Sequence, residues 1–399
     1  MARKYDAVVV GAGILGLASA YHILEGGRGG VRLLIIDRLA GPGRGNTARS
    51  AAAYRDMFSS PVNRHLSRAS IHFYEALQKN SVPLDLLRVG YLWLLTAQQH
   101  ARYGPFLQIM AKAGVVFQTL DRETLTRRLP GLEAGDISQG ILGANCGILN
   151  PNRLAGFYEK EILKLGGSFA YGAEVTGFTL DGRGWIRSVL AGPREILAGT
   201  VIVATGAWMG ATMALAGLTV PVVPKKRQLF AISTKAGALR QLHDTGAFNP
   251  QGLLPFTILP GQAYLRPAPT SFIVGYADED RAPGLEDNPV AEMDFFENRI
   301  RPQLERYFPA FQGLKPAYAW AGHYDYHPPH NLPFADRVAG AIVVGGTSGS
   351  GIMKGDSLGR IVAGLYDGRD RVELGDGKDF QVARLGLAAR NPAPEEFVI

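Results

Sequence analysis

Three glycines near the start of the chain, Gly11, Gly13 and Gly16, restrict its fold more than any other feature. They have the spacing GxGxxG and directly follow the apolar run of residues 8–10. In this pattern the first glycine permits a tight turn, the second lets the backbone approach a pyrophosphate, and the third lets the next helix pack against the strand. The free N–H groups at the start of that helix point at the phosphates. The stretch therefore predicts the strand, turn and helix of a dinucleotide-binding fold.

The same stretch has a second interpretation, which is a secretory signal. It follows a basic start, and residues 18–20 read Ala-Ser-Ala, like a cleavage site. Asp6, however, interrupts the apolar run where a signal would avoid a carboxylate. A second apolar run, residues 31–36, ends on Asp37, at about the distance from the glycines where a ribose-binding carboxylate belongs. These observations favour the dinucleotide-binding fold.

The composition is that of a globular protein, with 399 residues, 46% hydrophobic and 19% charged. This length favours two domains. The single cysteine, Cys146, excludes an internal disulfide, fits a reducing, cytoplasmic compartment and is expected in the core. The net charge is +7, which favours anionic ligands. The chain has no dense run of basic residues interleaved with aromatics, so the charge does not indicate nucleic-acid binding. The uncharged residues 200–224 read as a strand followed by glycine and proline breakers, so we expect no transmembrane segment. An oligomer and a peripheral membrane contact stay open.

Periodicity predicts the remaining elements. Helices are expected at 63–78, 98–113, 122–129, 152–165 and 289–307. Strands are expected at 90–96, 168–175, 200–204, 229–233, 262–266 and 271–276. A second strand, glycine-rich turn and helix is expected at 341–366 and would complete the nucleotide site from the far end of the chain.

Three blocks in this order resemble the D-amino-acid oxidase superfamily of FAD proteins. They are the N-terminal GAGILG with Asp37, the VIVATGAW of residues 201–208, and the GTSGSGIM of residues 346–353. This superfamily includes sarcosine oxidase, glycine oxidase, dimethylglycine dehydrogenase and dye-linked proline dehydrogenases. The resemblance implies noncovalent FAD in an α/β fold (α+β overall). A glutathione-reductase-type Rossmann domain (1–84, 148–215 and 325–399) would carry an inserted antiparallel-sheet substrate domain (85–147 and 216–324).

The resemblance also implies which residues contact FAD. The N-terminal group is Gly11, Gly13, Ile14, Leu15, Gly16, Asp37 and Arg38, joined by Thr47, Ala48, Arg49, Ser50 and Ala51 of the loop beside the flavin. The middle group is Val175, Ala204, Thr205, Gly206 and Trp208. The C-terminal group is Gly346, Ser348, Gly349, Ser350, Gly351, Ile352, Met353 and Lys354. A helix beginning at Gly351 would direct its positive end at the flavin N1/C2=O edge.

The chain departs from the superfamily pattern at positions that contact substrate or oxygen. Ile273 stands where oxidases of the sarcosine type have an oxygen-activating lysine, which tilts the prediction towards a dehydrogenase. Tyr324 stands where glycine oxidases have a carboxylate-binding arginine, as in the proline and dimethylglycine dehydrogenase branch. The carboxylate then needs other partners, and the candidates are Arg266, Tyr264, Tyr276 and Arg227. The spacing of His323, His327 and His330, with no acid or thiol cluster, argues against a metal site.

These residues predict oxidation of a small amine or amino acid, such as proline or sarcosine. Hydride would pass to flavin N5 and leave an imine, with the electron acceptor (dye, quinone or oxygen) undetermined. The expected catalytic residues are Arg49, Tyr264, Arg266, Tyr324 and Lys354. One alternative is a 2-hydroxy-acid oxidoreductase, with His323 or His327 as base. Another is a partner-binding flavoprotein that helps to assemble a respiratory complex, suggested by the Tyr-Asp-Tyr of residues 324–326.

Overall fold

The glycine motif forms the strand, turn and helix that its spacing predicts. In the computed structural model, which describes residues 4–27, 30–235, 237–328, 330–388, 395 and 397, β1 (Lys4–Val10) leads into α1 (Ile14–Glu25). Gly11 has φ +106°, which favours glycine, and a Cβ on Gly16 would lie 1.9 Å from the carbonyl oxygen of Gly11. The helix can therefore pack onto the turn only because position 16 carries no side chain.

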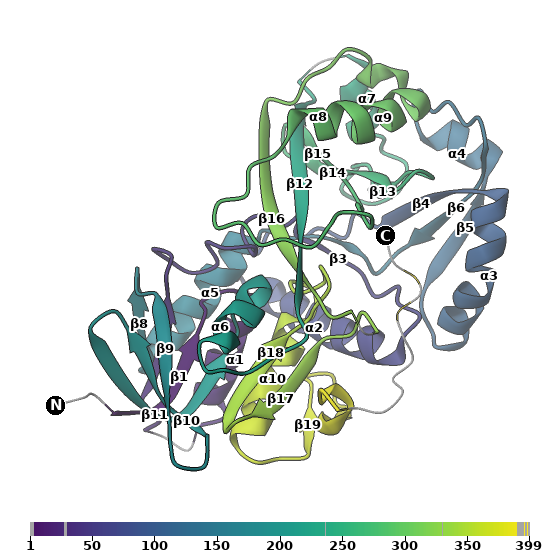
Figure 1. The fold of residues 1–399 in the computed structure, drawn as a ribbon. Coiled ribbons are helices and arrows are strands. Elements are labelled where there is room, and N and C mark those ends of the chain that lie inside the picture. Colours follow the sequence, from purple (N-terminus) through teal and green to yellow (C-terminus); the bar gives the residue numbers. More distant parts are fainter. Residues whose placement is uncertain are drawn as a thin grey trace.

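The first lobe is built on a sheet with the strand order β17-β18-β11-β1-β2-β8 (Figure 1). β1 pairs in parallel with β2 (Leu33–Asp37) and β11 (Arg194–Val203), and β11 pairs in parallel with β18 (Ala341–Gly345). The other strands are β8 (Ser168–Tyr171), β9 (Val175–Leu180), β10 (Ile186–Ala191) and β17 (Phe334–Val338). Because the parallel strands end at one edge, their carboxyl ends form the crevice where such sheets bind ligands.

Helices cover one face of this sheet and bury its apolar side chains. α1 packs against α10 (Gly355–Tyr366) and α5 (Pro151–Lys164), and α10 also packs against α2 (Pro61–Lys79). Residues 7–10 of β1 are all buried, as expected for a central parallel strand. The core of this lobe therefore draws on both ends of the chain.

The second lobe is a mainly antiparallel sheet with the order β16-β12-β15-β14-β13-β4-β6-β5 (Figure 1). Its strands are β4 (Tyr91–Thr96), β5 (Phe117–Asp121), β6 (Ile137–Gly143), β12 (Val223–Ser233), β13 (Phe256–Ile258), β14 (Ala263–Ala268), β15 (Ser271–Tyr276) and β16 (Tyr318–Tyr326). Its helices are α3 (Ala97–Lys112), α4 (Arg122–Arg128), α7 (Ala238–His243), α8 (Met293–Phe295) and α9 (Arg301–Tyr307). The long strands β12 and β16 run from this lobe towards the first one (Figure 1).

Short elements complete the described chain. They are β3 (Ala53–Tyr54) paired with β7 (Gly147–Ile148), β19 (Arg371–Glu373) paired with β20 (Asp379–Gln381), α6 (Met209–Ala214), and single helical turns at 206–208, 309–311 and 382–385. Among the described residues, no helix is both long and apolar enough to cross a bilayer. The residue ranges predicted for the two domains stay a prediction.

Several predicted elements were wrong in their bounds. Residues 168–175 are not one strand, because the chain turns at Gly172, which has φ +65°, before β9 begins. β12 begins at Val223, not at residue 229, since its first half pairs with β16. The helix predicted at 289–307 begins at Met293 and contains a π-helical segment over residues 296–300 just before Pro302, whose missing N–H cannot continue the α-helical ladder.

The last helix also begins later than predicted. Residues 351–354 form a turn, in which the N–H of Lys354 donates to the carbonyl of Gly351 at 3.3 Å. α10 starts at Gly355, and its first-turn acid, Asp356, accepts hydrogen bonds from His22 and Tyr158. The first N–H groups of this helix, those of Asp356 and Ser357, donate to the hydroxyls of Tyr74 and Ser70 at 3.3 and 3.0 Å. The amino terminus of α10 is therefore satisfied within the fold and lies four residues after Gly351.

Candidate active site

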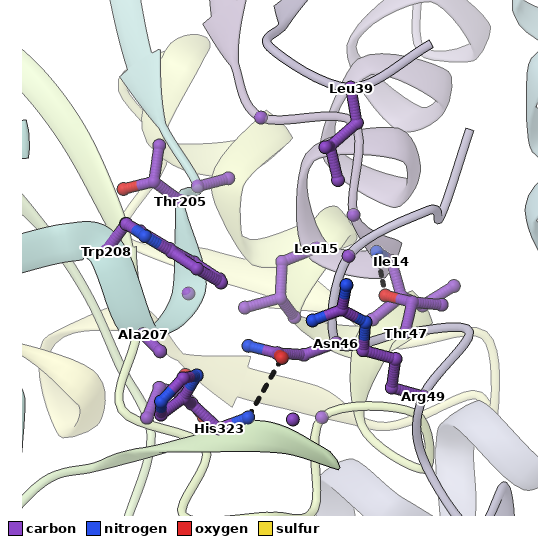
Figure 2. Close-up of a pocket in the computed structure, with 18 of the residues that line it drawn as sticks. Ile14, Leu15, Leu39, Asn46, Thr47, Arg49, Thr205, Ala207, Trp208 and His323 are labelled. Carbon is purple, nitrogen blue, oxygen red and sulfur yellow. Dashed lines mark hydrogen bonds between the residues drawn. The ribbon is translucent and has the colours of Figure 1, made fainter. Parts of the chain in front are cut away.

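A cavity of about 690 Å³ lies at the carboxyl ends of β1, β2 and β11 and continues to β16. Its walls come from the glycine turn, the loop of residues 45–51, the segment 173–176, the segment 204–208, and β16 with the turn of residues 347–352. Figure 2 shows Ile14 and Thr47 at one side of this cavity and Trp208 and His323 at the other. The cavity is thus long, and segments from the whole chain meet in it.

One end of the cavity has the features of a nucleotide site. The carboxylate of Asp37 accepts a hydrogen bond from the N–H of Ala12 at 2.6 Å and from that of Leu39 at 2.8 Å. The first N–H of α1, that of Ile14, donates to Thr47 Oγ1 at 3.0 Å (Figure 2). The strand end, the helix start and the loop are therefore tied together where phosphates would bind.

The loop of residues 45–51 is fixed by β16. The indole N–H of Trp320 donates to the carbonyl of Arg49 at 2.9 Å, and the N–H of His323 donates to Asn46 Oδ1 at 2.9 Å (Figure 2). A Cβ on Gly322 would lie 3.0 Å from Asn46 Oδ1 and 3.3 Å from Arg49 Cβ. The Trp-x-Gly of β16 therefore both holds the loop and leaves room for it.

The side of the cavity at Trp208 is closed by residues of both lobes. The guanidinium of Arg38 lies over the Trp208 ring, 4.6 Å from its centroid, and pairs with Asp287 at 3.0 Å. His323 Nε2 accepts from the N–H of Glu286 at 3.2 Å, so the neutral ring carries its hydrogen on Nδ1. Burial lowers the pKa of His323, which favours this neutral form.

At the other end a carboxylate clamps the glycine-rich turn. Asp325 accepts from the hydroxyl of Thr347 at 2.6 Å and from its N–H at 3.0 Å. Burial raises the pKa of the Asp325 carboxyl, and the hydrogen bonds from Thr347 oppose that rise. The ring of Tyr324 lies directly against Gly349. These contacts shape the end of the cavity where a flavin ring would lie.

A second cavity of about 140 Å³ adjoins this end. It shares walls with the first at Ser50, Ala51, Arg227, Tyr264, Tyr324, Gly349 and Ile352. Its other walls include Arg55, Phe58, Tyr91, Phe256, Tyr276, Glu279, Tyr326, Lys354 and Glu395. A compartment of this size beside the larger cavity suits a small substrate rather than a polymer.

Arg227 is the cation that faces both cavities. It lies on β12 opposite Gly322 of β16, and its guanidinium is 4.9 Å from the centroid of the Tyr324 ring. One of its nitrogens donates to the hydroxyl of Tyr326 at 2.9 Å, while its buried Nε has no partner among the described residues. A buried guanidinium with an open donor is suited to bind a carboxylate.

Lys354 is fully buried and lines the second cavity. Its ammonium donates to Asn63 Oδ1 at 2.7 Å and to Ser350 Oγ at 2.5 Å, and lies 4.7 Å from the Phe58 ring centroid. Burial lowers its pKa to about 7. Lys354 therefore changes between charged and neutral near neutral pH.

The structure brings most of the predicted site residues together. The first cavity is lined by Gly11, Gly13, Ile14, Leu15, Asp37, Arg38, Thr47, Arg49, Ser50, Ala51, Val175, Ala204, Thr205, Gly206, Trp208, Gly349, Gly351 and Ile352, and by the two tyrosines Tyr264 and Tyr324. Ser348, Ser350, Met353 and Lys354 line the second cavity. Gly16, Ala48 and Gly346 line neither, and Gly16 instead supports the helix packing.

The structure does not bring Arg266 to the site. Arg266 lies on the same face of β14 as Tyr264, but its guanidinium donates to the carbonyls of Pro267 and Leu149. Burial lowers its pKa to about 10. The side chain lies two residues further along the strand and lines neither cavity, whereas Arg227, another of the candidates, lines both.

Some lining residues were missed from the sequence. Asn46, Asp325 and Thr347 line the first cavity, and Arg55 and Glu279 line the second. His323, expected only as a base in the hydroxy-acid alternative, also lines the first cavity. The Trp-x-Gly and Tyr-Asp-Tyr segments were signals for part of this set, because they flank Tyr324. Arg55 and Glu279 belong to no motif.

Cys146 and His327 have structural surroundings. Cys146 is buried in the core near Asp56, and burial raises the pKa of its thiol. His327 Nδ1 bonds to the carbonyl of Leu332 at 2.8 Å, whereas His323 bonds elsewhere. Within the ranges that the structure describes, no three His, Cys, Asp or Glu side chains gather in a way that could hold a metal ion.

The first cavity fits an FAD molecule. It offers the Asp37 carboxylate and a helix start beside a glycine turn at one end, and aromatic and glycine-rich walls at the other end. Buried polar atoms that line it, Thr205 Oγ1, Trp208 Nε1 and His323 Nδ1, have no partner among the described residues. Such groups are normally satisfied by a bound ligand or water.

Comparisons with known proteins agree with this geometry. A sequence model of the family described as FAD dependent oxidoreductase matches residues 6–365. The Bos taurus FAD-dependent oxidoreductase domain-containing protein 1 is 28% identical over 90% of this chain and 81% of that protein. The glycine oxidase of Pseudomonas aeruginosa is 24% identical over 92% of this chain and 95% of that protein. The crystal structure of L-proline dehydrogenase from P. horikoshii matches with a TM-score of 0.80 and 22% identity, covering 94% of this chain and 96% of that one.

Proposed function

Because the chain belongs to the FAD dependent oxidoreductase family, we propose that it oxidises a small amine or amino acid that carries a carboxylate. FAD is the cofactor, and when bound it supplies a two-electron acceptor for the carbon beside the substrate nitrogen. The observation that carries the proposal is the position of Arg227, a buried cation in the wall shared by the two cavities.

In this proposal the residues of the second cavity bind and orient the substrate. Arg227 binds the carboxylate, with Tyr264 and Tyr324 beside it. Burial raises the pKa of both phenols, so they stay neutral and donate hydrogen bonds instead of repelling an anion. Phe58, Tyr91 and Phe256 supply apolar walls that exclude water from the reacting carbon.

Lys354 serves in the same proposal as a proton acceptor near the substrate nitrogen. An amine must lose its proton before the carbon beside it is oxidised. Because the pKa of Lys354 is about 7, part of the population carries the neutral amine near neutral pH, and its lone pair can accept that proton to form the ammonium. Arg49, whose backbone is tied to Trp320, would lie at the face of the flavin ring.

We favour a dehydrogenase over an oxidase. Ile273 lies on β15 and packs in the core around Tyr91 and Trp93, so it supplies no cation to the cavities. A fixed cation near the flavin would stabilise superoxide as it forms. The test must still cover three other cations, because Arg49 and Arg227 line the first cavity and Lys354 lines the second.

The test is anaerobic reduction of the purified, FAD-loaded protein. Proline, sarcosine, glycine and the 2-hydroxy acid lactate are each added, and loss of the oxidised flavin absorbance band is followed. Bleaching by an amino acid or secondary amine, but not by lactate, is the expected result. Bleaching by lactate alone would replace the proposal with a hydroxy-acid oxidoreductase. Reoxidation by a dye but not by air supports the dehydrogenase.

A further inference from the structure

One segment of the second lobe contributes walls to both cavities. Residues 277–292, which we call the strap, join β15 to α8 without a helix or strand. Its residue Glu279 lines the second cavity, and Leu285 and Asp287 line the first. Two carboxylates fasten it to β12, because Glu286 and Glu292 pair with Lys226 at 3.2 and 2.9 Å.

Glu279 is the carboxylate that the strap places beside Arg227. Its Oε1 lies 3.7 Å from Arg227 Nη2 and accepts a hydrogen bond from Tyr326 at 2.9 Å. Within the described residues, this is the one carboxylate at ion-pair distance from Arg227. The Glu279 side chain is 46% exposed, whereas that of Arg227 is 7% exposed. The carboxylate can therefore move into water, while the guanidinium cannot.

Glu279 therefore occupies a position beside Arg227 that the carboxylate of a ligand could also take. We propose that Glu279 competes with the substrate carboxylate for Arg227 and so sets how tightly carboxylate-bearing ligands bind. The inference rests on the proposed role of Arg227. Two carboxylates at one guanidinium repel each other, so an incoming anion must displace Glu279 towards solvent or bind against its charge. In the absence of a ligand, Glu279 neutralises a buried cation that would otherwise be costly.

The test uses the FAD-loaded protein and two matched probes, propionate and its uncharged analogue propionamide. Binding is measured by the change in flavin absorbance and, independently, by calorimetry at fixed salt. In Glu279→Gln the Kd for propionate should fall by about two- to fivefold, the range expected for loss of a half-exposed charge pair. The Kd for propionamide should not change.

Glu286→Gln is the matched control, because it removes the same charge from the same strap and its side chain lines neither cavity. Its propionate Kd should equal that of the unmodified protein. An unchanged or raised propionate Kd in Glu279→Gln overturns the inference, as does an equal fall in Glu286→Gln. No turnover is needed, so failure of the amine panel to bleach the flavin would overturn the proposed function without deciding this result.

Discussion

Gly349 lies so close to Tyr324 that a Cβ at position 349 would come within 2.2 Å of the Tyr324 ring. Gly349 also has φ +86°, so two separate constraints favour glycine there. The contact presses the glycine-rich turn against the tyrosine that lines both cavities. Through it, the position of the turn depends on the end of β16.

We expect Gly349→Ala to damage the site and the fold. The strained backbone and the clash with the ring should together lower the free energy of unfolding by about 2–4 kcal/mol. FAD should bind more weakly, because the turn lines its cavity. Gly217→Ala is the control, since Gly217 also has φ +71° but a Cβ there would meet nothing within 4 Å. It should cost only about 1 kcal/mol. Chemical denaturation and flavin fluorescence measure both effects, and equal losses in the two variants would contradict the prediction.

Removing the Asp37 carboxylate should weaken FAD binding. Asp37→Ala leaves the N–H groups of Ala12 and Leu39 without their acceptor and removes the expected ribose contact. Two such hydrogen bonds are worth about 1–3 kcal/mol, or roughly a 5- to 160-fold rise in the Kd for FAD. Asp6→Ala, at the exposed start of β1, should leave this Kd within about twofold. Titration of the apoprotein with FAD gives the answer, and equal values for Asp37→Ala and the unmodified protein would refute a ribose-binding role.

Variants of Arg227 and Arg266 would show which arginine binds the substrate carboxylate. Strand alternation in the sequence pointed to Arg266, whereas the structure places Arg227 at the cavities. Arg227→Met should raise the KM for a carboxylate-bearing substrate by about 30- to 100-fold, since a buried charge pair is worth roughly 2–3 kcal/mol. Arg266→Met should change KM by less than about threefold, because its guanidinium bonds to backbone carbonyls away from both cavities. Steady-state kinetics of both variants, with their FAD content matched, would distinguish them. A larger KM effect from Arg266 would restore the assignment made from the sequence.

Stability should depend on pH through Lys354. Its pKa is lowered from 10.5 to about 7 in the fold. Between these two values the unfolded chain binds one proton more than the native state, so stability rises with pH by about 1.4 kcal/mol per unit for this group. The excess stability of the unmodified protein over Lys354→Met should therefore grow from pH 7 to pH 10. Lys164→Met, at an exposed position, should show no such trend. Chemical denaturation at several pH values, with saturating FAD, gives the free energy of unfolding of each variant and its slope against pH.

The Arg38–Asp287 pair joins the two lobes across the first cavity, and we expect it to slow the release of FAD. Asp287 has a side chain that is 77% exposed, so the effect of Asp287→Asn should be modest, up to about a fivefold faster release. The difference should disappear at about 1 M salt, where such pairs are screened. The rate of FAD release is measured at two salt concentrations, with an excess of a second protein that captures the released FAD. A difference that persists in high salt would mean that Asp287 acts by another route.

Local patterns predicted the parts of the structure that local geometry decides. Gly11, Gly16 and Asp37 act through the turn and the strand next to them, and the helix at residues 61–79 follows the apolar periodicity. The start of α10 could not be found in this way, because it depends on a contact with α2, where the N–H groups of Asp356 and Ser357 donate to the hydroxyls of Tyr74 and Ser70. That contact joins residues on two different elements, and no periodicity reports it.

The substrate side of the site was less predictable for a similar reason. Alternation along β14 correctly put Tyr264 and Arg266 on one face, but it could not tell which of them reaches the cavity. Arg227 reaches it because β12 pairs with β16 over residues 223–231, a register fixed by contacts distant in sequence. Glu279 lies on a segment without regular structure, so neither helical nor strand periodicity marks it.

The order of strands in the first sheet limits when this sheet can form during synthesis on the ribosome. β1 emerges first, yet its neighbour β11 follows about midway, and β18, which completes that side, comes from residues 341–345. Since chains are made from the amino terminus onward, the pocket for FAD cannot close until β18 and the turn of residues 347–352 have been synthesised. Until then Ile202 and Val203 of β11 lack their parallel partners Ile342 and Val343, so FAD binding requires segments from distant parts of the chain.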